Sequence, residues 1–265
     1  MARIHPTAIV DPDCQLADGA EVGPYSIVRR GCHIGARTLV DAHVLLEHTS
    51  VGEDCQVGFG AALGGAPQDQ RYQNEPTRVI IGDRTVIREY VTIHRATGAG
   101  NATSVGTDCL LMAATHLGHN CQLGNGVTIS TLSGMSGHTV IEDMAIIGGM
   151  VGSHQRVRVG KLAMVSGLSK LSQDVPPFSL VDGKPARVVG PNLVGLRRAG
   201  MDLETRRALQ RAFRVIYRSA TDLSRALEEV RAELGGIPEV AYLLEFLDRM
   251  RQGRFGRQQE TARAC

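Results

Sequence analysis

The chain has 265 residues, of which 43% are apolar, and a formal net charge of +2 at pH 7. This apolar content is enough for a packed core. No apolar run approaches the ~20 residues that cross a bilayer, and the N-terminus lacks the apolar stretch of a secretory signal. We therefore predict a cytoplasmic protein without an integral membrane segment, and we expect no nucleic-acid partner.

A short repeat organises the first part of the chain. With 31 glycines and no tryptophan, the composition indicates many tight, regularly spaced corners. An aliphatic residue recurs at every sixth position in three series, of which the last has Ser153 as its exception. The series contain Ile4, Val10, Leu16, Val22, Val28, Ile34, Val40 and Leu46, then Val51, Val57, Leu63, Ile81, Ile87 and Ile93, and then Val105, Leu111, Leu117, Leu123, Ile129, Met135, Ile141, Ile147, Val159 and Val165.

Two other positions of each six-residue unit follow a pattern. Glycine often comes directly after the aliphatic residue, where we expect a corner with strained backbone dihedrals. The residue four places after the aliphatic one is small, and it is a cysteine at Cys14, Cys32, Cys55, Cys109 and Cys121. We expect these cysteines to be core residues rather than disulfide partners or metal ligands, and Cys265 to be inert. A six-residue period of strand and corner predicts a parallel β-helix.

Interruptions and the end of the repeat define the remaining organisation. Residues 64–80 and 98–104 break the period and are predicted to be loops that border a binding face. After residue 190 the apolar spacing becomes helical, so we predict a β-helix over 1–190 and an α-helical C-terminal domain over 191–265. Helices are expected at 203–218, with Asp202 as the N-terminal cap, and at 222–234 and 238–250. The segment from Gly253 onward is predicted to be a frayed tail.

Histidines concentrate between residues 94 and 154, next to the second interruption. His119 lies outside the two inward-facing positions of its unit, so we expect it to project outward from the β-helix. One coil of 18 residues further lies Gly137, and another coil further lies Gln155, which predicts a ladder of about 10 Å. Acyl transfer to a hydroxyl needs a base and an N–H donor for the oxyanion, and His119 and Gly137 match these requirements.

Several motifs resemble the UDP-N-acetylglucosamine O-acyltransferases of lipid A biosynthesis, which are acyl-carrier-protein-dependent members of the hexapeptide-repeat acyltransferases. The matching segments are distributed over nearly the whole chain. They are Glu75–Arg78, Val91–Arg95, Thr115–Cys121, Ser136–His138, Ile146–Met150, Ser153–Gln155, Gln173–Pro177 and Ile216–Ser219. The resemblance implies a left-handed parallel β-helix. It also implies a homotrimer with sites between subunits.

The resemblance assigns roles to particular residues. It implies that His119 removes the proton from the sugar's 3-hydroxyl, that Gly137 N–H stabilises the oxyanion and that His116 helps to position the substrate. The implied substrate-binding residues are Asp69, Arg71, His94, His138, His154, Gln155, Gly167, Asn192 and Arg198. Arg71 stands where the family commonly has Lys, and Ala199 replaces a second Arg. Gly167 matches a position where residue size affects the length of the acyl chain.

The acyl donor implied by the resemblance is acyl carrier protein, whose phosphopantetheine carries a (3-hydroxy)acyl chain, so no cofactor is expected. We expect the acidic carrier to dock on Arg and Lys near the groove, such as Arg156, Arg158 and Arg218.

Several alternatives remain open. One is an N-acyltransferase that acts on a UDP-3-amino sugar or on UDP-3-O-acyl-glucosamine. The latter family has a domain before its repeat, whereas here the repeat starts at Ile4. Gly183–Ala186 resembles a corner of acetyl-CoA-dependent relatives. A zinc enzyme of the carbonic-anhydrase type would draw three ligands from His94, His116, His119 and His138.

Overall fold

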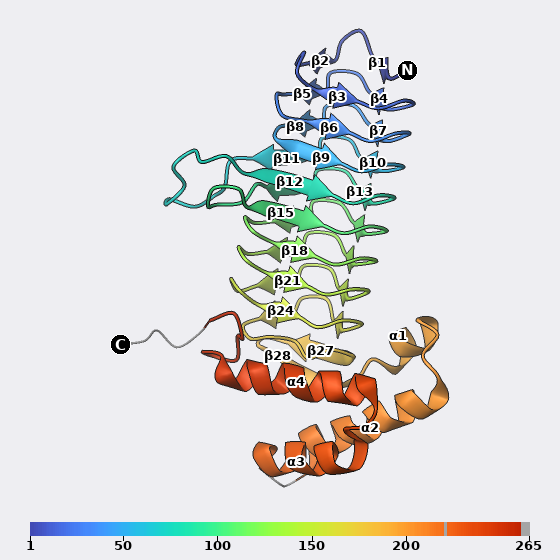
Figure 1. The fold of residues 1–265 in the computed structure, drawn as a ribbon, viewed down its shortest axis with the longest axis vertical. Helices are drawn as coiled ribbons and strands as arrows, with labels where there is room; N and C mark the ends of the chain where they lie inside the picture. The colour runs from blue at the N-terminus through green and yellow to red at the C-terminus, as the bar shows by residue number, and fades with distance from the viewer. Residues whose placement is uncertain (220–221, 261–265) are drawn as a thin grey trace.

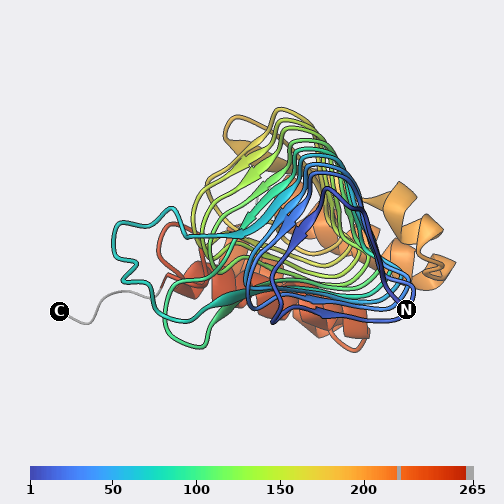
Figure 2. The same cartoon turned by 90° about the horizontal axis from the view of Figure 1, so that it is seen from above.

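The computed structural model, which describes residues 1–219 and 222–260, winds the repeat into a triangular prism with three walls (Figures 1 and 2). Each six-residue unit contributes a short strand to one wall and then turns a corner to the next. Strands of successive coils pair in parallel, for example β17 with β20 at His116↔Gly134. The fold is the predicted left-handed parallel β-helix.

The three walls are sheets, which we call A, B and C, and their strands are parallel except for β28 at the end of sheet A. Sheet A contains β1 (Arg3–Ile4), β4 (Glu21–Val22), β7 (Leu39–Val40), β10 (Gln56–Val57), β13 (Val86–Ile87), β16 (Leu110–Leu111), β19 (Thr128–Ile129), β22 (Ile146–Ile147), β25 (Met164–Val165), β27 (Ser179–Gly183) and β28 (Ala186–Pro191). Sheet B contains β2 (Ile9–Val10), β5 (Ile27–Val28), β8 (Leu45–Leu46), β11 (Ala62–Gly65), β14 (Thr92–His94), β17 (His116–Leu117), β20 (Gly134–Met135), β23 (Gly152–Ser153) and β26 (Lys170–Leu171). Sheet C contains β3 (Gln15–Leu16), β6 (His33–Ile34), β9 (Thr49–Val51), β12 (Arg78–Ile81), β15 (Ala102–Val105), β18 (Gln122–Leu123), β21 (Val140–Ile141) and β24 (Arg158–Val159).

The interior of the prism is filled by the two positions that the repeat predicts. The aliphatic residue and the small residue of each unit are buried through most of the stack, and Cys32, Cys55, Cys109 and Cys121 belong to this core. These cysteines are unpaired thiols, as is the partly buried Cys14. Ser153, the exception in the repeat, is buried, and its hydroxyl has hydrogen-bond partners. It accepts the Ser136 N–H and contacts the Thr139 hydroxyl. Cys265 lies outside the described residues.

The corners correct one interpretation of the sequence. The left-handed backbone conformation occurs three places after the aliphatic residue, mostly at residues other than glycine, such as Asn120 and His138 with φ of 60°. The glycines directly after the aliphatic residue instead allow adjacent coils to approach. A Cβ on Gly35 or Gly106 would lie 2.4 or 2.5 Å from a carbonyl oxygen of the next coil. Close stacking, rather than strained dihedrals, selects glycine there.

The first interruption is shorter than predicted, and the second has the predicted length but lies three residues earlier in the chain. Strands β11, β12 and β15 extend to four residues each, so the first extruded segment covers 66–77 and the second covers 95–101. We call these segments insert 1 and insert 2. The extension has a clear cause, because β12 pairs with β15 over four residues, from Arg78↔Ala102 to Ile81↔Val105. Both inserts leave the prism at the corner between sheets B and C (Figures 1 and 2).

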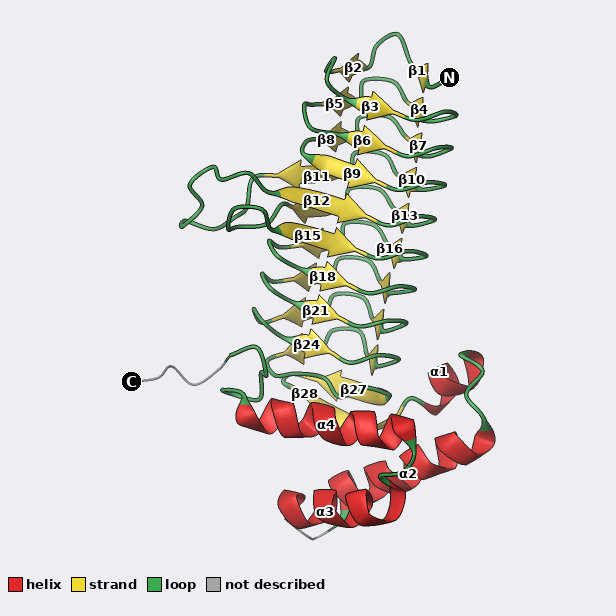
Figure 3. Ribbon diagram, in the orientation of Figure 1, coloured by secondary structure: helices red, strands yellow, loops and turns green. Residues whose placement is uncertain are grey.

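Four helices gather at the C-terminal end of the prism (Figure 3). The three predicted helices are α2 (Leu203–Arg218), α3 (Leu223–Leu234) and α4 (Pro238–Gln252), and Asp202 caps α2 by accepting the Thr205 N–H at 2.8 Å. Two elements were not predicted: the antiparallel hairpin of β27 and β28, and the short helix α1 (Leu193–Arg198). A second core around Phe178 and Phe213 packs the helices against the last coil. None of the helices described is long and apolar enough to cross a membrane.

The segment after α4 is not the frayed tail that we predicted, as far as residue 260. Arg257 is buried and donates to Ser172 O at 2.7 Å, and Gln258 N–H donates to the buried carboxylate of Asp174 at 2.8 Å. Gln259 Nε2 donates to the carbonyls of His138 and Arg156. This segment therefore lies along the corner between sheets B and C, the same corner that carries the inserts and the predicted base His119.

Candidate functional site

The corner between sheets B and C stacks the inserts above the predicted base. Insert 1 follows β11, insert 2 follows β14 one coil later, and His119 follows β17 one coil after that. Because consecutive coils are about 4.8 Å apart, both inserts lie within reach of the His119 side chain.

His119 projects outward from the prism core as predicted, but it is buried rather than exposed to solvent. Its side chain is outside the prism core, but only 5% of the residue is exposed. Insert 1 covers it from above, and the backbone of the next coil lies against it, so that a Cβ on Gly137 would be 2.4 Å from His119 Nε2. The six-residue period predicted that the His119 side chain points outward. Its burial results from insert 1, which the period does not describe.

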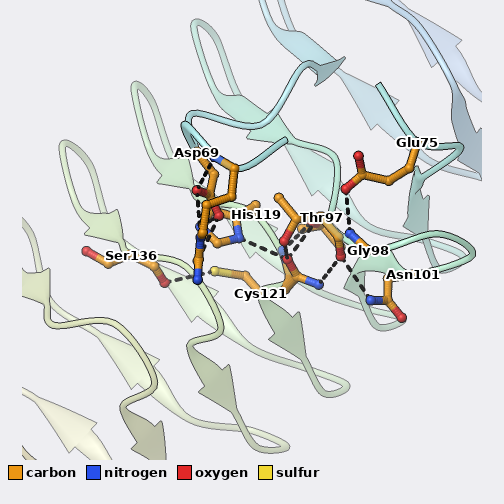
Figure 4. Close-up of polar contacts among 11 residues, drawn as sticks. Asp69, Glu75, Thr97, Gly98, Asn101, His119, Cys121 and Ser136 are labelled. Atoms are coloured by element: carbon orange, nitrogen blue, oxygen red, sulfur yellow. Dashed lines mark hydrogen bonds and ion pairs between the residues drawn. The ribbon is translucent and has the colours of Figure 1, made fainter. Parts of the chain in front are cut away.

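Hydrogen bonds fix the tautomer of His119 (Figure 4). Asn120 Oδ1 accepts the backbone N–H of Thr97 at 3.0 Å, which identifies this atom as the amide oxygen. His119 Nδ1 lies 2.9 Å from the same oxygen and must therefore carry a proton. In the neutral ring, Nε2 is then the unprotonated nitrogen and can accept a proton. Asn120 and Thr97 were missed as site residues, although Asn120 lies within the matching motif Thr115–Cys121.

Asp69 of insert 1 faces the other ring nitrogen. Its Oδ2 lies 3.9 Å from His119 Nε2, and its carboxylate pairs with Arg71, with Arg71 Nη2 at 2.9 Å from Oδ2. The Arg71 hydrogen bonds hold the pKa of Asp69 at about 2, so the carboxylate stays charged. An anion here stabilises the imidazolium that forms when Nε2 takes a proton. The Arg71 side chain is exposed, and its guanidinium donates two hydrogen bonds to the Asp69 carboxylate.

Gly137 forms the next step of the predicted ladder. The backbone links the steps, because His138 N–H donates to His119 O at 2.9 Å and Arg156 N–H donates to Gly137 O at 3.0 Å. Within the described residues, the Gly137 N–H has no acceptor. An N–H donor without a partner beside an unprotonated Nε2 is the pairing that an oxyanion and a general base require.

His138 packs edge-on against His119, with ring centroids 5.1 Å apart. Burial, reinforced by the nearby Arg156 and His119, lowers the pKa of His138 to about 4. It is therefore a neutral hydrogen-bonding group at pH 7. His154 and Gln155 lie one coil further along the same corner and are exposed.

His94 and His116 form a second pair on sheet B, with ring centroids 5.3 Å apart. His94 Nδ1 donates to Ala66 O of insert 1 at 2.6 Å, and His116 Nδ1 lies 2.8 Å from the Thr92 hydroxyl. Burial and the neighbouring His94 lower the pKa of His116. Across residues 1–219 and 222–260, no group of three or more His, Cys, Asp or Glu side chains is arranged to hold a metal ion.

Gly167, Asn192 and Arg198 do not join this cluster in one chain. Gly167 lies at the corner between sheets A and B, where a Cβ would be 3.2 Å from Gly149 O. Asn192 caps α1, and the exposed Arg198 ends it. Helix α1 lies on the opposite side of the prism from the inserts (Figure 2). The structure thus divides the predicted site between two sides of the molecule.

One residue expected to dock a protein partner is already engaged. Arg158 is paired with Glu142 at 2.6 Å, and Glu142 also accepts the Tyr242 hydroxyl of α4. This cluster fastens α4 to sheet C. Arg156, one coil after His138, is partly buried, and Arg218 is exposed at the end of α2.

Comparisons with known proteins agree over almost the entire chain. A family model described as UDP N-acetylglucosamine O-acyltransferase, domain 2, matches residues 174–255. The chain is 45% identical over 259 residues to the acyl-[acyl-carrier-protein]–UDP-N-acetylglucosamine O-acyltransferase of Burkholderia orbicola, covering 96% of this chain and 99% of the relative. The enzyme of the same name from Thermodesulfovibrio yellowstonii is 41% identical over 255 residues, with the same coverage.

Solved structures give the same result. The chain superimposes on the UDP-N-acetylglucosamine acyltransferase from Bacteroides fragilis with a TM-score of 0.88 and 33% identity, covering 92% of this chain and 96% of the other. The corresponding enzyme from Campylobacter jejuni gives a TM-score of 0.86 and 32% identity at the same coverage. The similarity includes the helical end of the molecule as well as the β-helix.

Proposed function

Since the chain belongs to the UDP-N-acetylglucosamine O-acyltransferase family, we propose that it transfers an acyl chain from acyl carrier protein to the 3-hydroxyl of UDP-N-acetylglucosamine, with His119 as general base. This O-acylation is the first step of lipid A biosynthesis. The acyl group arrives on the phosphopantetheine of the carrier protein, so the chain needs no cofactor of its own. We place the reaction in the cytoplasm.

In this mechanism the unprotonated Nε2 of His119 accepts the proton of the sugar hydroxyl as the oxygen attacks the thioester carbon. The Nδ1–H bond to Asn120 holds the ring in the required tautomer. The charged Asp69 then stabilises the imidazolium. His119 finally returns the proton to the departing thiolate of the carrier's phosphopantetheine, so the base is regenerated in each turnover.

The oxyanion develops on the thioester carbonyl oxygen, where a fixed N–H donor lowers the barrier. Gly137 N–H is the donor assigned to it. A side chain at this position would displace His119 Nε2, because a Cβ there would come within 2.4 Å of that atom. Glycine at 137 therefore serves two purposes: it leaves room for the base, and it exposes the amide.

We also propose a homotrimer with shared sites. The residues at the corner between sheets B and C carry the base, whereas Gly167, Asn192 and Arg198 lie elsewhere on the chain, so a neighbouring subunit would have to supply them. A row of apolar side chains at the corner between sheets A and B supports such contacts, each of them more than half exposed: Tyr25, Tyr90, Leu132, Met150 and Leu168.

The observation that carries the proposal is a buried histidine with an unprotonated Nε2 beside the amide of Gly137, which has no acceptor in the part of the chain that the structure describes. The test is an acyl-transfer assay with a series of acyl carrier proteins and two acceptors, UDP-N-acetylglucosamine and its 3-amino analogue. We expect an alkali-labile ester product with the hydroxyl sugar. Transfer to the amino sugar alone would contradict the proposal and favour the amide-forming alternative.

A further inference from the structure

Glu75 ties the two inserts together, although it is not among the predicted substrate-binding residues. Its Oε1 accepts the Gly98 N–H of insert 2 at 2.7 Å (Figure 4). Its Oε2 accepts the Gln73 N–H of insert 1 at 2.8 Å. Hydrogen bonds to a carboxylate are stronger than those between neutral groups. The Glu75 carboxylate therefore links insert 2 to insert 1 at Gly98, beside the backbone hydrogen bond from Gly100 N–H to Pro76 O at 2.9 Å.

From Gly98 the hydrogen bonds continue to the base. Gly98 follows Thr97, whose N–H and hydroxyl both bond to Asn120 Oδ1 at 3.0 Å. The Thr97 carbonyl accepts from Asn120 Nδ2 at 3.1 Å and from Asn101 Nδ2 at 2.9 Å. Asn120 Oδ1 in turn accepts His119 Nδ1–H. The sequence of contacts from Glu75 to the base is unbroken.

Insert 1 has anchors that do not involve the Glu75 carboxylate. Arg95 donates to Gly64 O at 2.7 Å and to the Tyr72 hydroxyl at 3.1 Å, and the Tyr72 hydroxyl donates to the Glu75 carbonyl. His94 holds Ala66 at the start of the insert. Loss of the carboxylate should therefore loosen insert 2 at Gly98 while insert 1, with Asp69, stays attached.

We propose that Glu75 is a positioning residue for the general base. By holding Gly98 it keeps Thr97 and Asn120 in the arrangement that fixes the proton on His119 Nδ1 and leaves Nε2 free. This role rests on the proposed function, because it concerns the same base. It adds a residue that acts through three others and touches neither the sugar nor the acyl chain.

The first test replaces the carboxylate by an isosteric amide, Glu75→Gln. The amide offers one acceptor oxygen where two N–H groups need one each, so kcat should fall about tenfold to a hundredfold through misplacement of the base. The KM for UDP-N-acetylglucosamine and the thermal midpoint should change little. Glu53→Gln is the matched control, since among the described residues the Glu53 side chain pairs only with the surface residue Arg37, at 2.9 Å, and this variant should retain the parent's kcat.

A double-mutant cycle with Asn120→Ala separates positioning from general weakening of the fold. If Glu75 acts through Asn120, the double variant should lose little more kcat than Asn120→Ala alone. Multiplicative losses, an unchanged kcat in Glu75→Gln, or a change confined to KM would each overturn the proposal. A parent protein that transfers no acyl chain would instead refute the proposed function, and this role with it.

Discussion

At the scale of single residues, the two nitrogens of His119 are held from opposite sides by different segments. Asp69 of insert 1 faces Nε2, and Thr97 of insert 2 holds Nδ1 through Asn120. Neither segment is near His119 in sequence. The reactivity of the His119 side chain therefore depends on inserts 1 and 2, which lie outside the six-residue repeat.

His119→Ala should lower kcat by about 10² to 10⁴, the usual contribution of a positioned base. Because His119 is buried and donates to Asn120, the variant should also lose about 1 kcal/mol of stability, the value of one hydrogen bond. Steady-state kinetics at saturating substrate and urea unfolding measure the two effects. Retention of more than about a tenth of the parent's kcat would exclude a general base.

His138 should make stability depend on pH. Its pKa in the folded protein, about 4, is below the ordinary value of 6.5, so protonation favours the unfolded chain. The stabilisation from neutral His138 is complete above pH 6.5 and is lost as the pH falls toward 4. His138→Gln cannot titrate, so its free energy of unfolding should decrease less between pH 7 and 4.5 than that of the parent. Parallel slopes for the two proteins would contradict this.

At the scale of elements, the segment after α4 acts as a clasp across the last coils of the prism. Arg257, buried at 6% exposure, donates to Ser172 O and pairs with Glu260 at 2.8 Å. Arg257→Ala leaves the Ser172 carbonyl without its partner and should cost about 1 to 3 kcal/mol in the free energy of unfolding. Arg254→Ala is the control, because Arg254 is exposed over the Phe255 ring and should change stability little. Equal losses of unfolding free energy in the two variants would show that the Arg257 contacts do not stabilise the last coils.

The sequence predicted the elements whose apolar spacing repeats over many residues. It did not predict the elements whose conformation depends on pairing with a neighbouring strand. The helices from 203 onward were predicted from apolar spacing and the Asp202 cap. The hairpin of β27 and β28, the helix α1 and the extended strands β12 and β15 were not. The hairpin, α1 and the residues that lengthen β12 and β15 lie outside the six-residue period, and the strand segments among them form because a neighbouring strand offers backbone partners.

At the scale of the whole molecule, shared sites predict complementation between inactive subunits. A His119→Ala chain keeps Arg198, and an Arg198→Ala chain keeps His119. If one subunit supplies the base and its neighbour supplies α1, mixed oligomers should recover activity in about a quarter of their sites, as random pairing requires. Co-expression of the two variants, compared with each alone, measures this. No recovery in verified mixed oligomers would place both residues in one subunit's site.

The sequence by itself determined the fold and the family. A six-residue period specifies the β-helix because each unit buries the same two positions, and the motifs around His119 and Gly137 lie on consecutive coils that this period aligns. The tertiary structure alone decided that His119 is buried, which nitrogen carries its proton, and that glycine serves close stacking rather than strained dihedrals. These properties arise from contacts between coils and inserts that are distant in sequence, such as Asp69 and Thr97 around one histidine, and no local pattern encodes them.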